Sequence, residues 1–406
     1  MSQEKTLKKR IFLLIFGVIS MLFAGIIYAW SILKNPLRAE FGWGTSDLAL
    51  NFTLTMCAFC LGGFFGSFLS RKIGTRISII ASGIMAGGGF ILTSMLNGES
   101  VVWLYLTYAL MAGGGIGIAY NVIISSVNAW FPDKKGFCSG CLMMGFGAST
   151  LILGKVAGAL FAIPEFGWRK TYILTGILLG VALVVSGFVI CRPGKDDILP
   201  SSVASNTHKE EFEPKDYTPS EMIRRPSFWM AFALLICLTA VGSSVISFAS
   251  DLAISVGSNT QMATTLVGVL SVCNGLGRIL TGKTYDLLGR RKTMLAANII
   301  TIFAAGITLI SVILHSLPLC IAGLCLTGIS YGASPTVSSA FSSSFYGMKH
   351  FPTNFSIMNF NLMLASFVAT ACSILQVNSG GFTAPFILLL GLSSFALVLN
   401  ISIKKP

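Results

Sequence analysis

Long apolar stretches, separated by short polar breaks, run along almost the whole chain. Each covers 20 residues or more, which is about the length that a helix needs to cross a hydrocarbon core of about 30 Å. They lie at residues 11–33, 47–69, 77–96, 101–128, 137–160, 171–191, 228–250, 262–285, 293–314, 317–344, 352–376 and 383–403. The pattern predicts an all-α polytopic membrane protein with twelve transmembrane helices.

Composition supports a chain that lies in lipid. Apolar residues make up 54% of it, charged residues only 11%, and the mean hydropathy is +0.79. A soluble protein carries about 25% charged residues, so this chain is too poor in charge to build a water-facing surface. The net charge of +13 does not indicate nucleic-acid binding, because the basic residues form short clusters between apolar runs.

The distribution of Lys and Arg predicts the orientation. Of the 28 basic residues, 22 lie on the side of the N-terminus and 4 on the opposite side, while Lys155 and Arg278 fall deeper within spans. By the positive-inside rule, both termini are cytoplasmic. We expect the first apolar run to stay as a membrane helix, because it is long and lacks the small-residue cleavage site of a signal peptide. The expected location is a bacterial plasma membrane.

A polar segment and an internal repeat divide the chain. Residues 192–226 are polar and contain several prolines, so we expect a cytoplasmic linker between an N-terminal half at 1–191 and a C-terminal half at 227–406. The segment 67–76 matches 282–291, and 117–120 matches 328–331, with offsets of 215 and 211 residues. Two matches at nearly one offset predict two pseudo-symmetric six-helix halves.

Several motifs resemble known transporters. The element Gly282-Lys-Thr-Tyr-Asp286-Leu-Leu-Gly289-Arg290-Arg291, the two halves and the linker resemble the major facilitator superfamily. Shorter sequence segments resemble the oxalate/formate antiporter family, which is allied to the monocarboxylate transporters. These segments are Tyr28-Ala-Trp-Ser-Ile-Leu, Pro36-Leu, Phe41-Gly-Trp43, Trp130-Phe-Pro-Asp-Lys-Lys-Gly136 and Gly145-Phe-Gly147.

The resemblance implies a gating role for the element that contains Gly282, Asp286, Gly289, Arg290 and Arg291. These residues would stabilise the outward-open state through cytoplasmic contacts between helix ends. The corresponding element of the first half has Ser67 in place of the glycine and Arg71 in place of the expected aspartate. A first-half latch of the same kind is therefore not expected.

Arg278 is the strongest candidate for substrate binding. It precedes Asp286 by eight residues, which places it about 12 Å from the cytoplasmic boundary and near the midplane. An arginine at this depth costs at least about 2.5 to 3.5 kcal/mol, and by default it faces a cavity on a substrate path. Asn274 lies one turn earlier and can donate a second hydrogen bond to a carboxylate. The alternative is an arginine whose side chain extends to the headgroups.

Further polar residues lie near the same depth. Tyr120 and Tyr331 occupy repeat-related positions near the midplane and are predicted to line the site, with ordinary packing as the alternative. Asn361 is a candidate ligand or a helix-helix contact. Tyr28, and Trp30 beside it, would form an aromatic lid or an interfacial anchor. Lys155 is expected at the outer boundary, extending to the headgroups.

Enzymatic and metal-dependent functions are not expected. Apart from Asp47 at the first position of the run 47–69, no Asp, Glu or His lies within a predicted span, so neither a buried proton relay nor an acid-base pair can be assembled. The ten cysteines lie in or at the ends of apolar runs, and the two CxxC pairs have no further ligands nearby. We therefore predict no cofactor and no metal site.

The resulting functional hypothesis is a secondary active transporter of a small organic anion. Oxalate/formate antiporters, by resemblance, place a lysine on the eleventh helix, whereas residues 353–366 contain no cation. One cation suits one carboxylate, so we expect a monocarboxylate such as lactate, pyruvate or formate, carried by a monomer in symport with a proton or in exchange for an anion. The alternatives are a dicarboxylate antiporter, a carboxylate receptor that does not transport, and a multidrug exporter.

The orientation can be tested by thiol labelling. A cysteine placed at Ser205, in a chain without other reactive thiols, should react with a membrane-impermeant reagent only from the cytoplasmic side, because the linker lies there. Labelling from outside intact cells would reverse the predicted topology.

Overall fold

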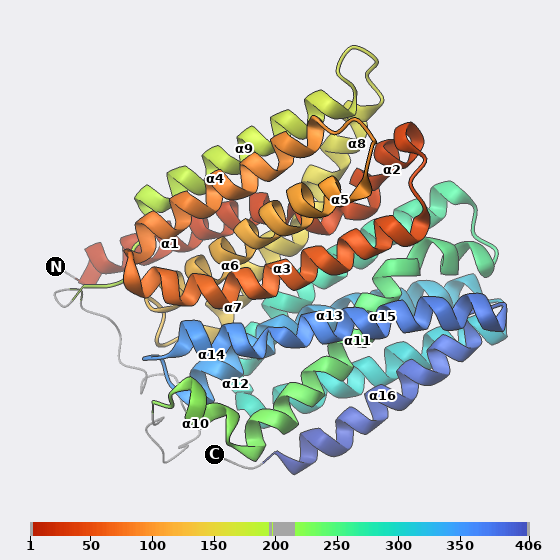
Figure 1. The fold of residues 1–406 in the computed structure, drawn as a ribbon. Coiled ribbons are helices and arrows are strands. Elements are labelled where there is room, and N and C mark those ends of the chain that lie inside the picture. The colour runs from red at the N-terminus through yellow and green to blue at the C-terminus, as the bar shows by residue number, and fades with distance from the viewer. Residues whose placement is uncertain (1–2, 195–196, 198–215, 404–406) are drawn as a thin grey trace. The chain divides into compact units, whose positions relative to one another are not determined.

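The computed structural model of the chain describes residues 3–194, 197 and 216–403, and in these residues every regular element is helical (Figure 1). The elements of the N-terminal part are α1 (Gln3–Ala24), η1 (Gly25–Ala29), α2 (Trp30–Phe41), α3 (Thr45–Lys72), α4 (Gly74–Ser94), α5 (Val101–Leu104), η2 (Tyr105–Gly113), α6 (Gly114–Asn128), α7 (Lys135–Ser149), η3 (Thr150–Gly154), α8 (Lys155–Phe161) and α9 (Gly167–Val189). The C-terminal part contains α10 (Pro219–Ile223), α11 (Pro226–Ser255), α12 (Thr260–Ile313), α13 (Leu317–Tyr346), α14 (Phe351–Met358), α15 (Phe360–Ser379) and α16 (Thr383–Ser402).

The number of membrane crossings agrees with the prediction. Eleven helical segments of the described chain are long and apolar enough to cross a membrane. One of them, Thr265–Ile313, has 49 residues, about 74 Å of helix, which is more than twice the hydrocarbon thickness. Gly289 interrupts it with φ 75° and ψ 175°, a conformation that glycine adopts without a steric penalty. This segment therefore supplies two crossings, and the all-α fold with twelve spans is confirmed.

The helices extend further than the apolar runs. The first continuous segment reaches from Thr6 to Phe41, with a short 3₁₀ stretch at η1. Glu40 and Asp251 consequently lie in the last turns of α2 and α11, although the apolar runs end before them. Polar end turns are compatible with a spanning helix because they project into the headgroup region.

The described chain separates into two compact units. The first comprises residues 1–133 and 145–204, and the second comprises 134–144 and 205–406. The first part of α7 therefore groups with the second unit. Most of the predicted linker lies outside the described residues, but its last part forms α10. The side chain of Met222 in α10 is fully buried in the second unit.

Close helix contacts in the first unit depend on glycine. A Cβ at Gly117 of α6 would lie 2.0 Å from the carbonyl oxygen of Phe59 in α3, and one at Gly62 would lie 2.2 Å from that of Gly114. Gly87 of α4 and Gly176 of α9 approach each other in the same way, and these two helices lie side by side in Figure 1. The glycines of residues 113–117 thus serve helix packing.

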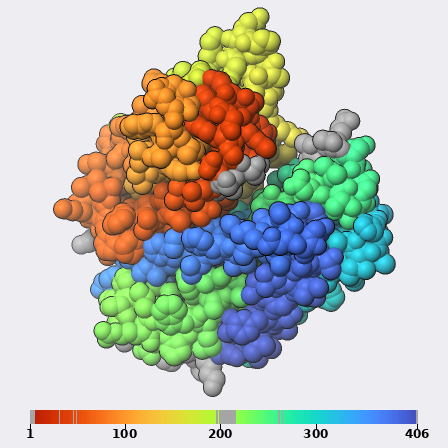
Figure 2. Space-filling model, turned by 45° about the vertical axis from the view of Figure 1, so that its right-hand side comes forward, coloured from red at the N-terminus to blue at the C-terminus, as the bar shows by residue number. Residues whose placement is uncertain are grey.

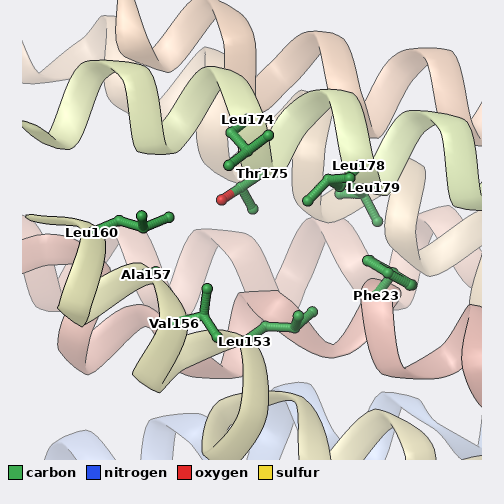
Figure 3. Close-up of a pocket in the computed structure, with 9 residues that line it drawn as sticks. All are labelled: Phe23, Leu153, Val156, Ala157, Leu160, Leu174, Thr175, Leu178 and Leu179. Atoms are coloured by element: carbon green, nitrogen blue, oxygen red, sulfur yellow. The ribbon is translucent and has the colours of Figure 1, made fainter. Parts of the chain in front are cut away.

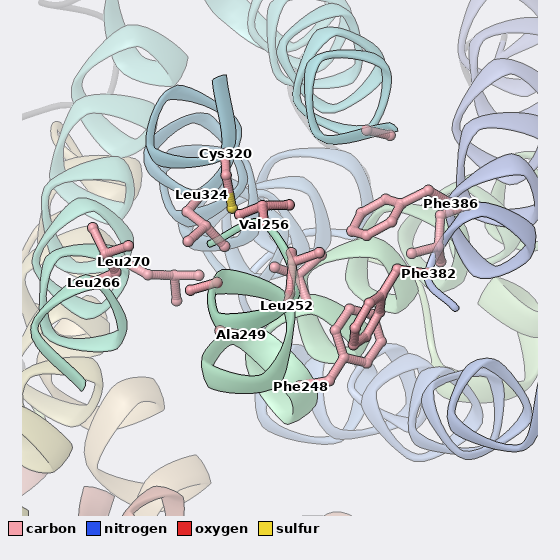
Figure 4. Close-up of a cluster of buried hydrophobic side chains, with 14 of the residues drawn as sticks. Phe248, Ala249, Leu252, Val256, Leu266, Leu270, Cys320, Leu324, Phe382 and Phe386 are labelled. Atoms are coloured by element: carbon pink, nitrogen blue, oxygen red, sulfur yellow. The ribbon is translucent and has the colours of Figure 1, made fainter. Parts of the chain in front are cut away.

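The second unit has an apolar core between α11, α12, α13 and α16. Figure 4 shows its side chains, among them Leu252, Leu270, Leu324 and Phe386, meeting between these helices. Figure 2 shows α15 and α16 at the surface of this unit.

Large apolar side chains cover the outer faces of both units. Phe65 and Phe188 of the first unit are each 61% exposed, and Val377 of the second is 74% exposed. Exposed apolar surface of this extent fits lipid contact.

Gly117 offers a test of the packing. Gly117→Ala should lower the thermal unfolding midpoint in detergent by several degrees, since the added methyl group would overlap the Phe59 carbonyl. Gly88→Ala is the matched control, because a Cβ at Gly88 meets no atom within 4 Å. Equal midpoints for the two variants would show that α3 and α6 do not need this close approach.

Candidate functional site

Arg278 lies inside the second unit, at the contact of α7, α12 and α13. The residue is 2% exposed. Its Nε donates to the Oδ1 of Asn274, 3.2 Å away and one turn earlier in α12. Its Nη1 donates to the carbonyl oxygen of Met143 in α7, at 2.5 Å. The guanidinium is thus held by two neutral acceptors.

Small residues make this enclosure possible. A Cβ at Gly140 of α7 would lie 2.5 Å from the Arg278 carbonyl oxygen, and one at Gly332 of α13 would lie 2.3 Å from that of Asn274. Gly277 and Ile329 approach equally closely between α12 and α13. The three backbones meet around Arg278, and the Thr336 hydroxyl adds a contact to the Arg278 carbonyl at 3.4 Å.

The charge of Arg278 has no carboxylate partner in the described part of the chain. None of the ion pairs there includes this residue. Its Nη2 also makes no hydrogen bond to the described residues. A buried guanidinium whose Nη2 donor is unused is suited to pair with an anion, because a bidentate carboxylate contact uses two N–H donors.

The predicted gating element makes a definite contact in the second unit. The carboxylate of Asp286 accepts hydrogen bonds from the backbone N–H groups of Gly136, at 2.9 Å, and Phe137, at 2.7 Å. These are donors of the first turn of α7, which the helix itself cannot satisfy. A Cβ at Gly282 would lie 2.2 Å from the Gly136 carbonyl oxygen, so the glycine allows the approach.

The other members of the gating element lie around this contact. Gly289 forms the break in α12. The guanidinium of Arg290 lies over the ring of Phe345, 5.1 Å from its centroid. Arg291 is exposed. Gating by these residues stays a prediction.

Tyr28 and Tyr120 belong to an aromatic cluster in the first unit. Tyr28 contacts the ring of Phe146 edge-on, with centroids 5.1 Å apart. Tyr120 packs on Phe146 at 5.1 Å and on Phe59 at 5.0 Å. Phe59 and Phe146 were not predicted as site residues. For Phe146 the signal in the sequence was its position between two glycines, at residues 145 and 147. In the structure, Gly25 packs directly on the Phe146 carbonyl oxygen.

Tyr331 and Asn361 lie in the second unit. Tyr331 packs against Gly242 of α11, where a Cβ would lie 2.1 Å from its ring, and is 6% exposed. Asn361 accepts a hydrogen bond from Thr239 at 3.1 Å and donates to the Met358 carbonyl at 2.5 Å. Both ends of the Asn361 amide therefore bond within the protein, as a helix-helix contact requires. Ligand binding by Tyr331 and Asn361 stays a prediction.

Two other sequence-predicted positions differ in exposure. Lys155 is exposed at the start of α8, as an extended side chain at a membrane boundary would be. Trp30 is only 4% exposed, donates its indole N–H to the Leu48 carbonyl at 2.9 Å, and packs on Tyr108. Trp30 is thus buried inside the first unit, and its role as a lid or an interfacial anchor stays a prediction.

The first unit contains a small apolar hollow between α1, α8 and α9 (Figure 3). Its volume is about 40 Å³, and Thr175 supplies its one hydroxyl among the lining residues. Its almost wholly apolar lining contains no charged group that could bind an organic anion.

Comparison with known proteins shows the family. The profile of the Major Facilitator Superfamily matches residues 13–283 and 233–405. The chain belongs to the major facilitator superfamily. The transport fold is also seen in solved structures. The proton:xylose symporter XylE superposes with a TM-score of 0.80 at 13% identity, over 98% of this chain and 96% of that one.

Relatives narrow the resemblance within the superfamily. The oxalate:formate antiporter of Oxalobacter formigenes is 28% identical over 289 residues, which are 71% of this chain and 66% of that protein, just under two thirds. Monocarboxylate transporter 12 of Homo sapiens is 26% identical over 362 residues, 82% of this chain and 68% of that protein. The resemblance to both groups of carboxylate transporters is confirmed, and the chain is a multi-pass membrane protein of a transporter family.

Proposed function

We propose that this superfamily member is a secondary active transporter of a small monocarboxylate of the lactate, pyruvate and formate class. Arg278 would pair with the carboxylate, and Asn274 would hold the guanidinium in place through its Nε. Tyr120, Tyr331, Tyr28 and Asn361 are proposed to shape the substrate path. Transport would proceed by alternating access in a bacterial plasma membrane with both termini cytoplasmic, in symport with a proton or in exchange for an anion.

The buried, uncompensated charge of Arg278 is the observation that carries this proposal. Keeping an ion away from water costs several kcal/mol unless it is paired and hydrogen-bonded. Here the described residues supply two neutral acceptors and no acid. If the substrate is an anion, its binding compensates the buried charge and recovers the free energy spent on burying it. A buried arginine of this kind therefore favours an anionic substrate.

The number of cations favours a single carboxylate. The α14–α15 stretch at residues 353–366 carries no Lys or Arg, and its Asn361 amide is bonded to Thr239 and Met358. Lys155 is exposed at the start of α8. A dianion at Arg278 would keep one charge unpaired.

The second candidate is exchange of a dicarboxylate. The name of the 28% identical relative, an oxalate:formate antiporter, supports it. The two candidates differ in the number of substrate charges, so a competition experiment can separate them.

Removal of the guanidinium tests the proposal directly. Arg278→Gln should lower uptake of labelled lactate, pyruvate or formate into proteoliposomes by at least about tenfold, since a charged hydrogen-bonded contact is worth about 1.5 to 3 kcal/mol. Arg278→Lys should recover little, because the planar fork is lost. Lys170→Gln, at an exposed lysine bonded to the Glu165 carbonyl, should transport normally. Wild-type uptake by Arg278→Gln would assign Arg278 a structural role.

Competition tests the number of charges. Oxalate should displace labelled monocarboxylate at least about tenfold less well than lactate or formate does, because leaving its second charge unpaired costs more than 1.4 kcal/mol. Strong inhibition by oxalate would favour the dicarboxylate antiporter. If Lys155→Ala then removed oxalate inhibition alone, Lys155 would be the second cation.

A further inference from the structure

The short connector between α6 and α7 carries the chain from the first unit into the second. It comprises residues 129–134, and the boundary between the units falls between Asp133 and Lys134. The helix begins at once, because the carbonyl oxygen of Lys134 accepts a hydrogen bond from the N–H of Cys138 at 3.0 Å, the first bond of the helical ladder. A contact that fixes Asp133 therefore fixes the chain directly before α7.

Arg10 of α1 binds this connector within the first unit. Its guanidinium forms an ion pair with the carboxylate of Asp133, and it lies over the ring of Phe131, 4.5 Å from the centroid. The side chains of Arg10 and Asp133 are only 6% and 15% exposed. A charged hydrogen bond that is shielded from water in this way is stronger than an exposed one. One cation thus holds two residues of the connector.

Lys9, the preceding residue of α1, makes parallel contacts. Its ammonium group lies 4.4 Å from the centroid of the Trp130 ring and 3.8 Å from the carboxylate of Asp197. Trp130 is fully buried, and its indole N–H donates to the Cys191 carbonyl at 2.7 Å. Two successive basic residues of α1 therefore face two successive aromatic residues of the connector, which is anchored at more than one point.

The second unit holds the segment that follows, residues 134–144. The carboxylate of Asp286 accepts a hydrogen bond from the N–H of Gly136 in the first turn of α7. About two turns further on, the carbonyl oxygen of Met143 accepts the bond from Arg278. Because Gly136 and Met143 lie in one continuous helix, a displacement of its first turn also displaces the acceptor of the Arg278 guanidinium.

The same helical segment of the first unit contacts the chain directly after residues 134–144. From Gly145 onward, α7 belongs to the first unit again. A Cβ at Gly145 would lie 2.4 Å from the carbonyl oxygen of Val18 in α1, and one at Gly25, which follows α1, would lie 2.0 Å from that of Phe146. The segment 134–144 is therefore attached at both of its ends to α1 and the residue that follows it.

We propose that Arg10 and Asp133 are positioning residues for the cation that binds the substrate. Their ion pair fixes the start of α7, and α7 in turn presents the Met143 carbonyl to Arg278. This role rests on the proposed function, in which Arg278 pairs with the carboxylate. Arg10 and Asp133 do not contact the substrate themselves, because they act only through α7.

Removal of the acid tests this role without a substrate. Cys138 reports on the start of α7, because it lies in the first turn and is 0% exposed. In a chain that keeps only this cysteine, Asp133→Asn should raise the rate of labelling by N-ethylmaleimide in proteoliposomes by about three- to tenfold, since a charged hydrogen bond is worth about tenfold in an equilibrium constant and Asp286 still holds α7. A parent rate for Asp133→Asn would overturn the proposal.

Variants of Arg10 show whether the two residues act as a pair. Arg10→Gln should label about three- to tenfold faster than the parent, for the same reason. Arg10→Lys keeps a cation for Asp133 and should label at close to the parent rate. The double variant Arg10→Gln with Asp133→Asn should label no faster than the faster single variant, because both changes remove one contact. Additive effects would overturn the proposal.

Two controls separate positioning from a general loosening of the first unit. Glu40→Gln removes the acid of the exposed ion pair with Arg169, near the other end of the helical segment that contains Arg10, and should label at the parent rate. In a chain that keeps only Cys60, which is 2% exposed in α3, Asp133→Asn should leave the labelling rate unchanged. Equal acceleration at Cys60 and Cys138 would assign the pair a merely structural role and overturn the proposal.

Transport kinetics connect the pair to Arg278. Asp133→Asn should raise the KM for labelled lactate, pyruvate or formate by about three- to tenfold and change the maximal rate less, because a guanidinium that is poorly held loses binding rather than turnover. An unchanged KM would overturn the proposal. If the wild-type chain takes up no monocarboxylate, the proposed function fails by itself, and the labelling of Cys138 still decides whether the pair holds α7.

Discussion

The guanidinium of Arg278 sits between α7 and α12 with one amide oxygen and one peptide carbonyl as partners. Neutral acceptors reduce the cost of burying a charge, but they do not cancel the charge. This arrangement supports the proposal that Arg278 binds the substrate anion. Three helices approach closely around Arg278 and enclose it. Among the described residues no carboxylate pairs with it, and its Nη2 donor is unused.

Glycine determines how closely the helices approach in both units. At Gly117 and Gly62 in the first unit, and at Gly140, Gly277 and Gly332 in the second, a Cβ would overlap a neighbouring carbonyl group. In a membrane, apolar side chains gain little by leaving lipid for each other, so direct backbone packing contributes more to helix association. Among the contacts of the second unit, Arg278 is 2% exposed and its side chain bonds within the protein.

The start of α7 connects Arg278 to the end of the second unit that holds Asp286. Met143, whose carbonyl binds Arg278, lies about two turns after Gly136, whose N–H binds Asp286. One short helical segment thus contacts the proposed substrate-binding cation and the acid of the predicted gating element. A movement of this segment would change both contacts together, as coupling between binding and gating requires.

Sequence alone determined the all-helical membrane fold and predicted the repeat and the depth of Arg278, because spanning length, basic clusters and rise per residue are local properties. It also identified Asn274, which lies one helical turn before Arg278, and Asp286, which belongs to the motif at residues 282–291. Only the tertiary structure decided what these side chains meet. The Met143 carbonyl, the aromatic partners Phe59 and Phe146, and the burial of Trp30 depend on which distant helices pack together. The folded end of the linker is such a case, since a segment too polar to form its own core becomes ordered where another unit provides one.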